Sequence, residues 1–284
     1  MPTPFGSLNY MLYGGFGSGN LIILAARPSV GKTTIGLQMA QCASLNGRKA
    51  IFFSLEMTAQ ELVQRLIVGT GLVSTLEIVT QNVNWENYER AVSMAVNPNL
   101  KINDKAKTLE EICTRITLEA QSGNCNIAFV DYLTLVRYAD RQKTQAQVIG
   151  EITARLKSVA KECNIPVVLL SQLNRDSAKE ARSPQLYDLR DSGAIEQDAD
   201  VVIMLERPKD DMGVVVEDKI DMWVRKNRGG KTSTDTPIHL IGNSNYSDFQ
   251  EESVRIQYVP QSEPEPMPSP QPENTDLFDK QEDF

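Results

Sequence analysis

The stretch from Leu21 to Thr34, LIILAARPSVGKTT, limits the possible folds of this chain more than any other feature. It opens with four consecutive apolar residues, a pattern that suits a central parallel strand covered on both faces. From Ala26 to Thr33 it follows the template G-x-x-x-x-G-K-[ST], except that Ala26 stands where the template has glycine. An apolar helical pattern comes next. A strand, a glycine-lysine turn and a helix in this order predict a phosphate-binding loop in an α/β protein.

Each residue type in this loop has a chemical reason to be there. Backbone N–H groups at the start of a helix can surround a phosphate, and the helix dipole favours the anion. Lys32 would reach the β and γ phosphates, and the Thr33 hydroxyl would coordinate Mg²⁺. A chance glycine-lysine turn is the alternative, but the match lies between a strand pattern and a helix pattern. The predicted nucleotide-binding residues are Ser29, Val30, Gly31, Lys32, Thr33 and Thr34.

Composition indicates one large globular domain, residues 1–259, followed by a tail, residues 260–284. The chain has 284 residues, 41% of them hydrophobic, which is enough for a sizeable core. The tail is rich in Pro, Glu, Gln and Ser, so we expect it to be disordered. Its seven acidic residues against one lysine account for −6 of the net charge of −8. An acidic total therefore does not exclude a nucleic-acid partner for the domain.

Cysteine and histidine usage argues against several kinds of chemistry. The four cysteines are widely spaced without a C-x-x-C pair, so they are predicted to be buried reduced thiols rather than zinc ligands or disulfides. His239 is the only histidine and lies in an apolar run, so histidine catalysis is not expected. No apolar run approaches 18 residues, and the N-terminus lacks a signal-peptide pattern. We therefore expect a soluble protein of the bacterial cytoplasm, or of the host cytoplasm if a phage or mobile element encodes it.

Three polar residues follow apolar runs that predict further buried strands. Glu56 comes after AIFFS, Asp131 ends NIAFVD, and Gln172 follows an apolar run from Ile165 to Leu170. Open α/β sheets bind ligands at the carboxyl ends of their strands, so these residues are candidates for a water-activating base, a metal-linked acid and a γ-phosphate contact. Glu56 is equally well explained as a charge near a helix N-terminus. Asp131 and Gln172 could be turn or capping residues.

Two charged segments remain open to more than one interpretation. Residues 188–200, DLRDSGAIEQDAD, have the charge density of a solvated loop, and loops at this face of a sheet can move when the nucleotide changes. A strand from Lys219 to Arg225 is predicted to lead into RKNRGGKT, which carries Arg225, Lys226, Arg228 and Lys231. This basic segment is either a solvated hairpin tip or a set of cations directed at the phosphates of another subunit.

Taken together, the ordered motifs AARPSVGKTT, FSLEM, VDYLTL, LSQLNR, DLRDSGAIEQDAD and KNRGG resemble the motor domain of DnaB-type replicative helicases over residues 2–258. The resemblance also accounts for Ala26, because AARPS in place of a glycine start is common in that family. It implies a RecA-like P-loop NTPase fold with a central, mostly parallel sheet flanked by helices. It further implies ATP and Mg²⁺ as cofactors and a hexameric ring of identical subunits around single-stranded DNA.

The resemblance also assigns roles to individual residues. Lys32 and Thr33 match the phosphate and Mg²⁺ contacts, Glu56 the catalytic base, and Asp131 the metal-linked acid. Gln172 matches a sensor between nucleotide and DNA loops. Lys226 and Arg228 match a basic pair that the neighbouring subunit inserts as fingers into the nucleotide site. The residues that match contacts to the DNA backbone are Arg190, Asp191 and Gly193. Many relatives have Glu at the position of Asp191, which weakens the assignment of a DNA contact to this residue.

The leading hypothesis is an ATP-dependent helicase that translocates 5′→3′ on single-stranded DNA and unwinds duplex during replication. The alternatives are a DNA-binding ATPase that loads or remodels a complex without unwinding, and an inactive structural subunit. Family members usually carry an N-terminal helical domain and a linker helix before the motor. We therefore expect either a piece of a longer protein or a compact relative from a phage or mobile element. No loader or primase partner is inferred.

Overall fold

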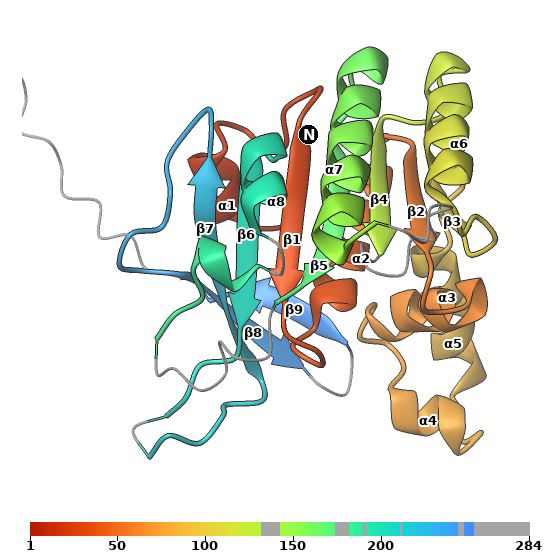
Figure 1. The fold of residues 1–284 in the computed structure, drawn as a ribbon. Helices are drawn as coiled ribbons and strands as arrows, with labels where there is room; N and C mark the ends of the chain where they lie inside the picture. Colours follow the sequence, from red (N-terminus) through yellow and green to blue (C-terminus); the bar gives the residue numbers. More distant parts are fainter. Residues whose placement is uncertain (132–142, 174–181, 190–191, 211, 244–246, 253–284) are drawn as a thin grey trace, which may run out of the picture. The chain divides into compact units, whose positions relative to one another are not determined.

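The computed structural model describes residues 1–131, 143–173, 182–189, 192–210, 212–243 and 247–252. In these residues the chain forms one nine-stranded sheet with the order β3-β2-β4-β5-β1-β6-β7-β8-β9 (Figure 1). The strands from β3 to β6 in this order are parallel, and β7, β8 and β9 extend the sheet antiparallel beyond β6. The strand bounds are β1 Leu21–Ala26, β2 Ala50–Ser54, β3 Leu100–Asn103, β4 Ile127–Asp131, β5 Val167–Gln172, β6 Val201–Glu206, β7 Lys219–Asn227, β8 Ile238–Asn243 and β9 Asp248–Glu251.

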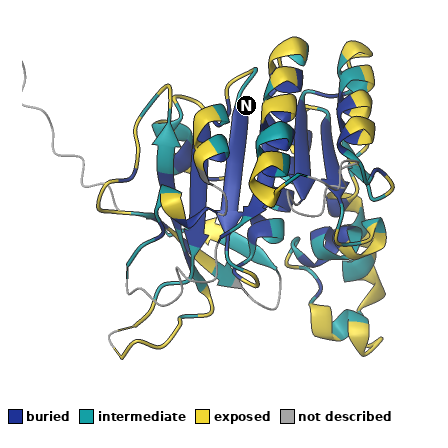
Figure 2. Ribbon diagram, in the orientation of Figure 1, coloured by how far each residue is buried: buried dark blue, intermediate teal, exposed yellow. Residues whose placement is uncertain are grey.

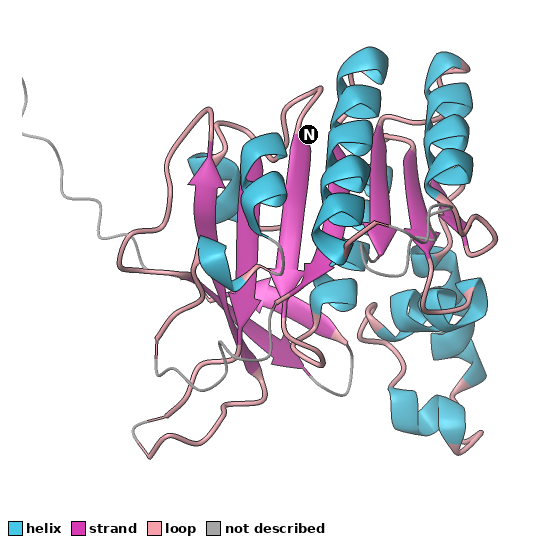
Figure 3. Cartoon of the chain, in the orientation of Figure 1, coloured by secondary structure: helices cyan, strands magenta, loops and turns pink. Residues whose placement is uncertain are grey.

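Helices cover both faces of the sheet (Figure 3). Two separate hydrophobic clusters form, one between the sheet and α1, α2, α3 and α5, and the other between the sheet and α6, α7 and α8. The helix bounds are α1 Gly6–Met11, α2 Lys32–Leu45, α3 Ala59–Val68, α4 Thr75–Val79, α5 Trp85–Ala95, α6 Leu109–Gln121, α7 Gln145–Cys163 and α8 Ser192–Asp198, with a short 3-10 helix at Leu186–Asp188. None of the helices in the described ranges is both long and apolar enough to cross a membrane.

The central strands are buried along their whole length, as their continuous apolar sequences predict (Figure 2). Along β1, Ile22 and Leu24 belong to the cluster under α2, whereas Leu21 and Ile23 belong to the cluster under α7. Successive side chains of a strand point to opposite faces, so one strand contributes to both layers. This two-sided burial confirms the predicted strand that leads into the phosphate loop.

We expect Leu24→Ala to lower the free energy of unfolding by about 2–5 kcal/mol, because it removes methyl groups from a fully buried site and leaves a cavity. Leu76→Ala is the matched control, since the same change at a side chain that is 71% exposed is expected to cost less than about 1 kcal/mol. Urea denaturation of both variants measures the difference. Equal costs would contradict the assignment of β1 to the centre of the core.

The expectation of a solvated loop at residues 188–200 was wrong for most of the segment. Residues 186–188 form the 3-10 helix and residues 192–198 form α8. Ile195 and Ala199 are fully buried in the cluster under α7, and Asp200 is 6% exposed. Ile195 on α8 and Ala199, the residue directly after its end, thus anchor this charged segment to the core. Ahead of β1, the chain also forms the short helix α1, whose Leu8 is buried.

The four cysteines are free. Cys113 and Cys125 are buried as predicted, whereas Cys42 and Cys163 are half-buried. Burial raises the pKa of the Cys113 thiol to about 11 and that of Cys125 to about 12, so both stay protonated at neutral pH. The predicted tail, residues 260–284, and the apolar run that follows Asp131 lie outside the described residues.

Candidate nucleotide-binding site

A cavity of about 710 Å³ opens where the carboxyl ends of the parallel strands meet. Its walls come from the loop after β1, the turn after β2, helix α3, the end of β5, the segment after β6, and β9. This is the position at which open α/β sheets bind their ligands. The residues that line it are Arg27, Pro28, Ser29, Gly31, Lys32, Thr33, Thr34, Glu56, Met57, Glu61, Gln64, Arg65, Val68, Thr75, Gln172, Arg207, Ser247 and Phe249.

The phosphate loop joins the end of β1 directly to α2. Gly31 is the N-cap of α2 with a φ of 113°, a left-handed conformation that favours glycine. A Cβ at this position would lie 3.2 Å from Ile220 Cδ1 and 3.3 Å from Phe249 Cε2. Ser29 also has a positive φ, of 65°. Of the six predicted loop residues, five line the cavity, whereas the Val30 side chain is 7% exposed and packs in the core.

Lys32, Thr33 and Asp131 come together at the base of the cavity. The Thr33 hydroxyl donates a hydrogen bond of 2.7 Å to Asp131 Oδ2, and Lys32 Nζ lies 3.6 Å from Asp131 Oδ1. Asp131 is 1% exposed, and its Oδ1 accepts no hydrogen bond from any described residue. Burial lowers the pKa of the Lys32 ammonium, and the nearby carboxylates of Asp131 and Glu56 partly oppose that effect. A hydroxyl and a buried carboxylate are the hard oxygen donors that suit Mg²⁺.

Glu56 and Gln172 reach the same cavity from two other strands. Glu56 is exposed and follows β2, whose last residue Ser54 pairs with Asp131 on β4. Gln172 ends β5 opposite Ala26, the last residue of β1. The capping box of α3 is formed by Thr58 and Glu61, and Glu56 lies two residues before this N-cap without taking part in the box.

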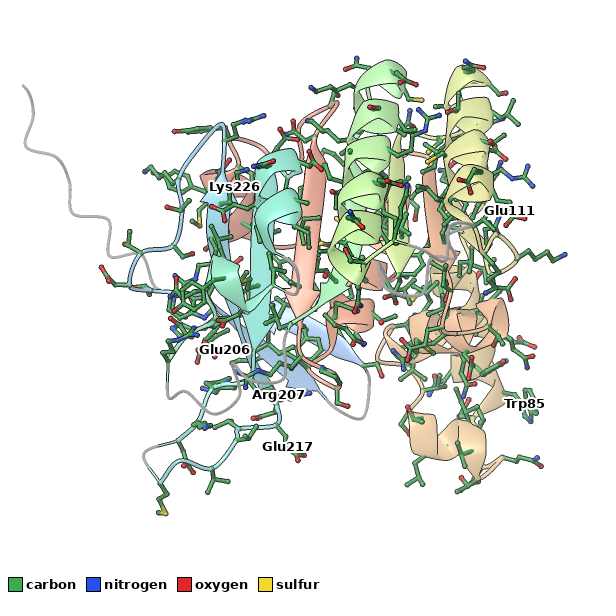
Figure 4. All side chains as sticks on the ribbon, in the orientation of Figure 1. Trp85, Glu111, Glu206, Arg207, Glu217 and Lys226 are labelled. Atoms are coloured by element: carbon green, nitrogen blue, oxygen red, sulfur yellow. The ribbon has the colours of Figure 1, made fainter. Side chains whose placement is uncertain are left out.

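Several cavity residues were missed at the sequence level. Arg207 directly follows β6, and its Nη1 is buried without a hydrogen-bond partner among the described residues (Figure 4). The rule applied to Glu56 and Asp131, a polar residue at the carboxyl end of an apolar strand, would have found it. Arg65 on α3 and Phe249 on β9 also line the cavity. No sequence signal marks them, because their elements reach the site only through the fold.

The basic pair Lys226 and Arg228 lies at the end of the sheet where the parallel strands begin, opposite the cavity. Asn227, between the two, pairs with Val201 on β6, and Val201 pairs with Ile22 near the start of β1. The phosphate loop follows the other end of β1. A six-residue strand spans about 20 Å. Figure 4 shows Lys226 and Arg207 at opposite ends of the sheet. The pair therefore cannot serve the cavity of its own chain.

Contacts within the chain differ between the two basic residues. Lys226 Nζ donates to the main-chain oxygens of Ala199, at 2.6 Å, and of Glu196, both at the carboxyl end of α8. The Arg228 side chain is 64% exposed, with Nη1 3.6 Å from Asp200 Oδ1. Burial, and secondarily the charge of Arg228, lowers the pKa of Lys226. Among the predicted DNA contacts, Gly193 lies exposed on α8, whereas Arg190 and Asp191 lie outside the described residues.

A mostly parallel sheet with a phosphate loop after its central strand, and with the acid Asp131 at the tip of a strand beside that loop, defines a RecA-like P-loop domain. The chain belongs to the DnaB-like helicase C-terminal domain family, whose model matches residues 1–251. This membership confirms the resemblance drawn from the motifs.

Similar proteins agree with this assignment. The replicative DNA helicase DnaC of Bacillus subtilis is 35% identical over 246 residues, which are 82% of this chain and 53% of that protein. The replicative DNA helicase DnaB of Rickettsia conorii is 39% identical over 209 residues, 68% of this chain and 42% of that protein. The chain thus spans about half the length of the curated relatives that it matches.

Two solved structures share the fold. One is described as an ATPase domain and has a TM-score of 0.81 and 30% identity, covering 89% of this chain and 91% of that one. The other is a DnaB-like replicative helicase, whose structure was described with its interactions with primase, and it has a TM-score of 0.80 and 30% identity. That alignment covers 88% of this chain and 62% of the other.

Proposed function

We propose that this chain is the motor of an ATP-dependent DNA helicase, which hydrolyses ATP at subunit interfaces to translocate 5′→3′ on single-stranded DNA and unwind duplex during replication. The observation that carries the proposal is the joining of Lys32, Thr33 and Asp131 at the base of a cavity that Glu56 also lines. Family membership supplies the helicase context.

ATP is the proposed ligand of the cavity. The loop from Ser29 to Thr34 would surround its phosphates, and the Lys32 ammonium would neutralise charge on the β and γ phosphates. Thr33, through its hydroxyl, and Asp131 would hold Mg²⁺, which when bound offsets the negative charge that develops on the phosphates. Burial of Lys32 and Asp131 strengthens these interactions, because charges attract more strongly where water is excluded.

Glu56 is the proposed general base and Gln172 the proposed γ-phosphate contact. The Glu56 carboxylate would accept a proton from the attacking water, which then adds to the γ phosphorus as the bond to ADP breaks. The Gln172 amide can hydrogen-bond a γ-phosphate oxygen without adding charge. Its place at the end of β5, where it lines the cavity, suits a sensor of nucleotide state.

The partners we propose are single-stranded DNA and further copies of this chain in a hexameric ring. Arg228, exposed and about a strand's length from its own cavity, would enter the nucleotide site of the adjacent copy. Arg190, Asp191 and Gly193 would contact the DNA backbone, and such contacts hold a strand without reading its sequence. One structural neighbour is described with primase, and we propose a primase as a partner of this protein.

A forked-duplex assay tests the helicase function. With ATP, Mg²⁺ and an assembled oligomer, the protein is expected to displace the strand of a fork that has a free 5′ tail, and not to displace it when only a 3′ tail is present. Replacing ATP by a non-hydrolysable analogue is the control and should abolish displacement. Hydrolysis stimulated by DNA without any strand displacement would contradict the helicase proposal and favour a loading or remodelling ATPase.

A further inference from the structure

The 3-10 helix at residues 186–188 presents an aromatic side chain beside α8. Tyr187, in the middle of this short helix, is 64% exposed, and the 3-10 helix packs against α8. Helix α8 carries Gly193, one of the proposed DNA contacts, which is exposed. A Cβ at Gly193 would meet no described atom within 4 Å, so the surface there is open. A strand that runs over Gly193 would therefore pass close to the Tyr187 ring.

One face of the Tyr187 ring is covered by a guanidinium group that is itself held in place. Arg182 Cζ lies 4.6 Å from the ring centroid. Arg182 Nη1 and Nη2 lie 2.7 and 2.8 Å from the two carboxylate oxygens of Asp188, which is only 4% exposed. Because Tyr187 remains largely exposed with one ring face covered, its other face is in contact with solvent. The ring is thus supported from one side and open on the other.

Arg225 fixes the chain just before Tyr187 to β7. Its Nε donates a hydrogen bond of 2.7 Å to the main-chain oxygen of Pro184, and its Nη2 donates one of 2.7 Å to Ser183 Oγ. These contacts lie on one side of Tyr187 in the sequence, and the buried ion pair of Asp188 lies on the other. The segment that carries the ring is therefore held on both sides of it.

Arg225 reaches that segment from a β-bulge in β7. Lys226 pairs with Val202 and Val224 pairs with Ile203, so Arg225 has no partner on β6. A bulge bends its strand and changes the direction of the side chains around it. The support of the 3-10 helix thus depends on how β7 pairs with β6, which no local sequence pattern indicates.

Exposure alone would not make Tyr187 a binding residue, because single exposed aromatic side chains are common. Tyr10 is exposed to a similar extent, 69%, and Lys231 Nζ lies 4.8 Å from the centroid of its ring. Lys231 is itself exposed, so the Tyr10 ring lacks the buried anchor that Asp188 provides for Tyr187. What distinguishes Tyr187 is a ring that is exposed and at the same time fixed.

We propose that Tyr187 stacks on a base of single-stranded DNA that passes over Gly193. The inference rests on the function proposed above, and it adds a contact with the bases to the contacts with the DNA backbone. Every base has an aromatic face, so stacking tolerates any sequence, as a motor that moves along a strand requires. A ring that is already fixed loses little conformational entropy when the base binds.

The test measures fluorescence anisotropy of two labelled strands on the full chain, assembled with a non-hydrolysable ATP analogue. One strand is an oligothymidylate, and the other is an abasic strand with the same number of phosphates. Tyr187→Ala is expected to weaken binding of the oligothymidylate about tenfold, because one stacked base is lost. Binding of the abasic strand should not change. Tyr187→Phe keeps the ring and should bind both strands normally, and Tyr10→Ala is the matched control that should also do so.

The salt dependence of binding is a second readout. Tyr187→Ala should leave the slope of log affinity against log salt concentration unchanged, because no phosphate contact is removed. Equal weakening for both strands, or unchanged binding of the oligothymidylate, would overturn the proposal. Loss of the oligomer in Tyr187→Ala, seen by native mass spectrometry, would place Tyr187 at a contact between copies and would also overturn it. If the unchanged protein bound neither strand, the proposed DNA-binding function itself would fail, which is a separate result.

Discussion

Glu56→Gln is expected to lower DNA-stimulated ATP hydrolysis by about 10²-fold or more while leaving nucleotide binding close to that of the unchanged protein. The amide keeps the shape of the side chain but cannot accept the proton of the attacking water. Glu56 is exposed to the cavity and takes no part in capping α3, so its replacement should not disturb the surrounding structure. Steady-state hydrolysis and binding of a fluorescent ATP analogue measure the two effects.

Glu61→Gln is the matched control for this experiment. Glu61 lines the same cavity, but its carboxylate accepts hydrogen bonds of 2.7 Å from the Thr58 main-chain N–H and 2.8 Å from the Thr58 hydroxyl. The same change there should alter hydrolysis less than about threefold, because it weakens a helix cap rather than removing a base. If Glu56→Gln hydrolysed ATP as fast as Glu61→Gln, the assignment of the base would be wrong.

Mixing two inactive variants is expected to restore hydrolysis if each nucleotide site is shared by two copies of the chain. Lys32→Ala removes the phosphate-binding ammonium. Arg228→Ala removes the arginine, and the loss of an arginine that acts across an interface lowers the hydrolysis rate by about 10³-fold or more. In a mixed ring, an Arg228→Ala subunit still has an intact loop, and a Lys32→Ala neighbour still supplies its arginine. With random assembly about a quarter of the interfaces carry both intact groups, which sets the expected recovery.

The control mixes Arg228→Ala with the double variant Lys32→Ala/Arg228→Ala, which supplies no intact arginine and should restore nothing. Native mass spectrometry of the same samples establishes that mixed oligomers have formed. Mixed oligomers without any recovery of hydrolysis would show that Arg228 does not act in the neighbouring site. Recovery in the control mixture would show that Arg228 is not needed for hydrolysis.

The sequence predicted those parts of the site whose position depends on local structure. The loop from Ser29 to Thr34 lies between a strand and a helix that each have a clear pattern, so its place in the fold followed from its neighbours in the chain. Glu56 and Asp131 were found for a related reason. Asp131 ends a strand, Glu56 follows one closely, and parallel strands end at the same edge of a sheet. Arg207 satisfies the same rule and could have been found.

Other parts of the site depend on contacts between distant segments, and no pattern in the sequence indicated them. Phe249 reaches the cavity because β9 lies at the end of the antiparallel extension, close enough to the phosphate loop that a Cβ at Gly31 would lie 3.3 Å from its ring. Helix α8 was taken for a loop because charged residues dominate the segment 188–200, in which Ile195 and Ala199 are the buried anchors. Patterns along a chain report local periodicity, whereas these contacts arise from how separate elements pack.

Lys226, in β7, and Arg228, the first residue after that strand, illustrate both cases. The sequence by itself determined that they form a cationic pair at the end of a strand, and the family resemblance placed both in a neighbouring site. Only the tertiary structure showed that a bulge at Arg225 turns Lys226 toward the carbonyls of α8 while Arg228 remains exposed. The physical reason is that one unpaired residue in a β-ladder reverses the face of every side chain after it, and whether a residue is unpaired depends on the partner strand.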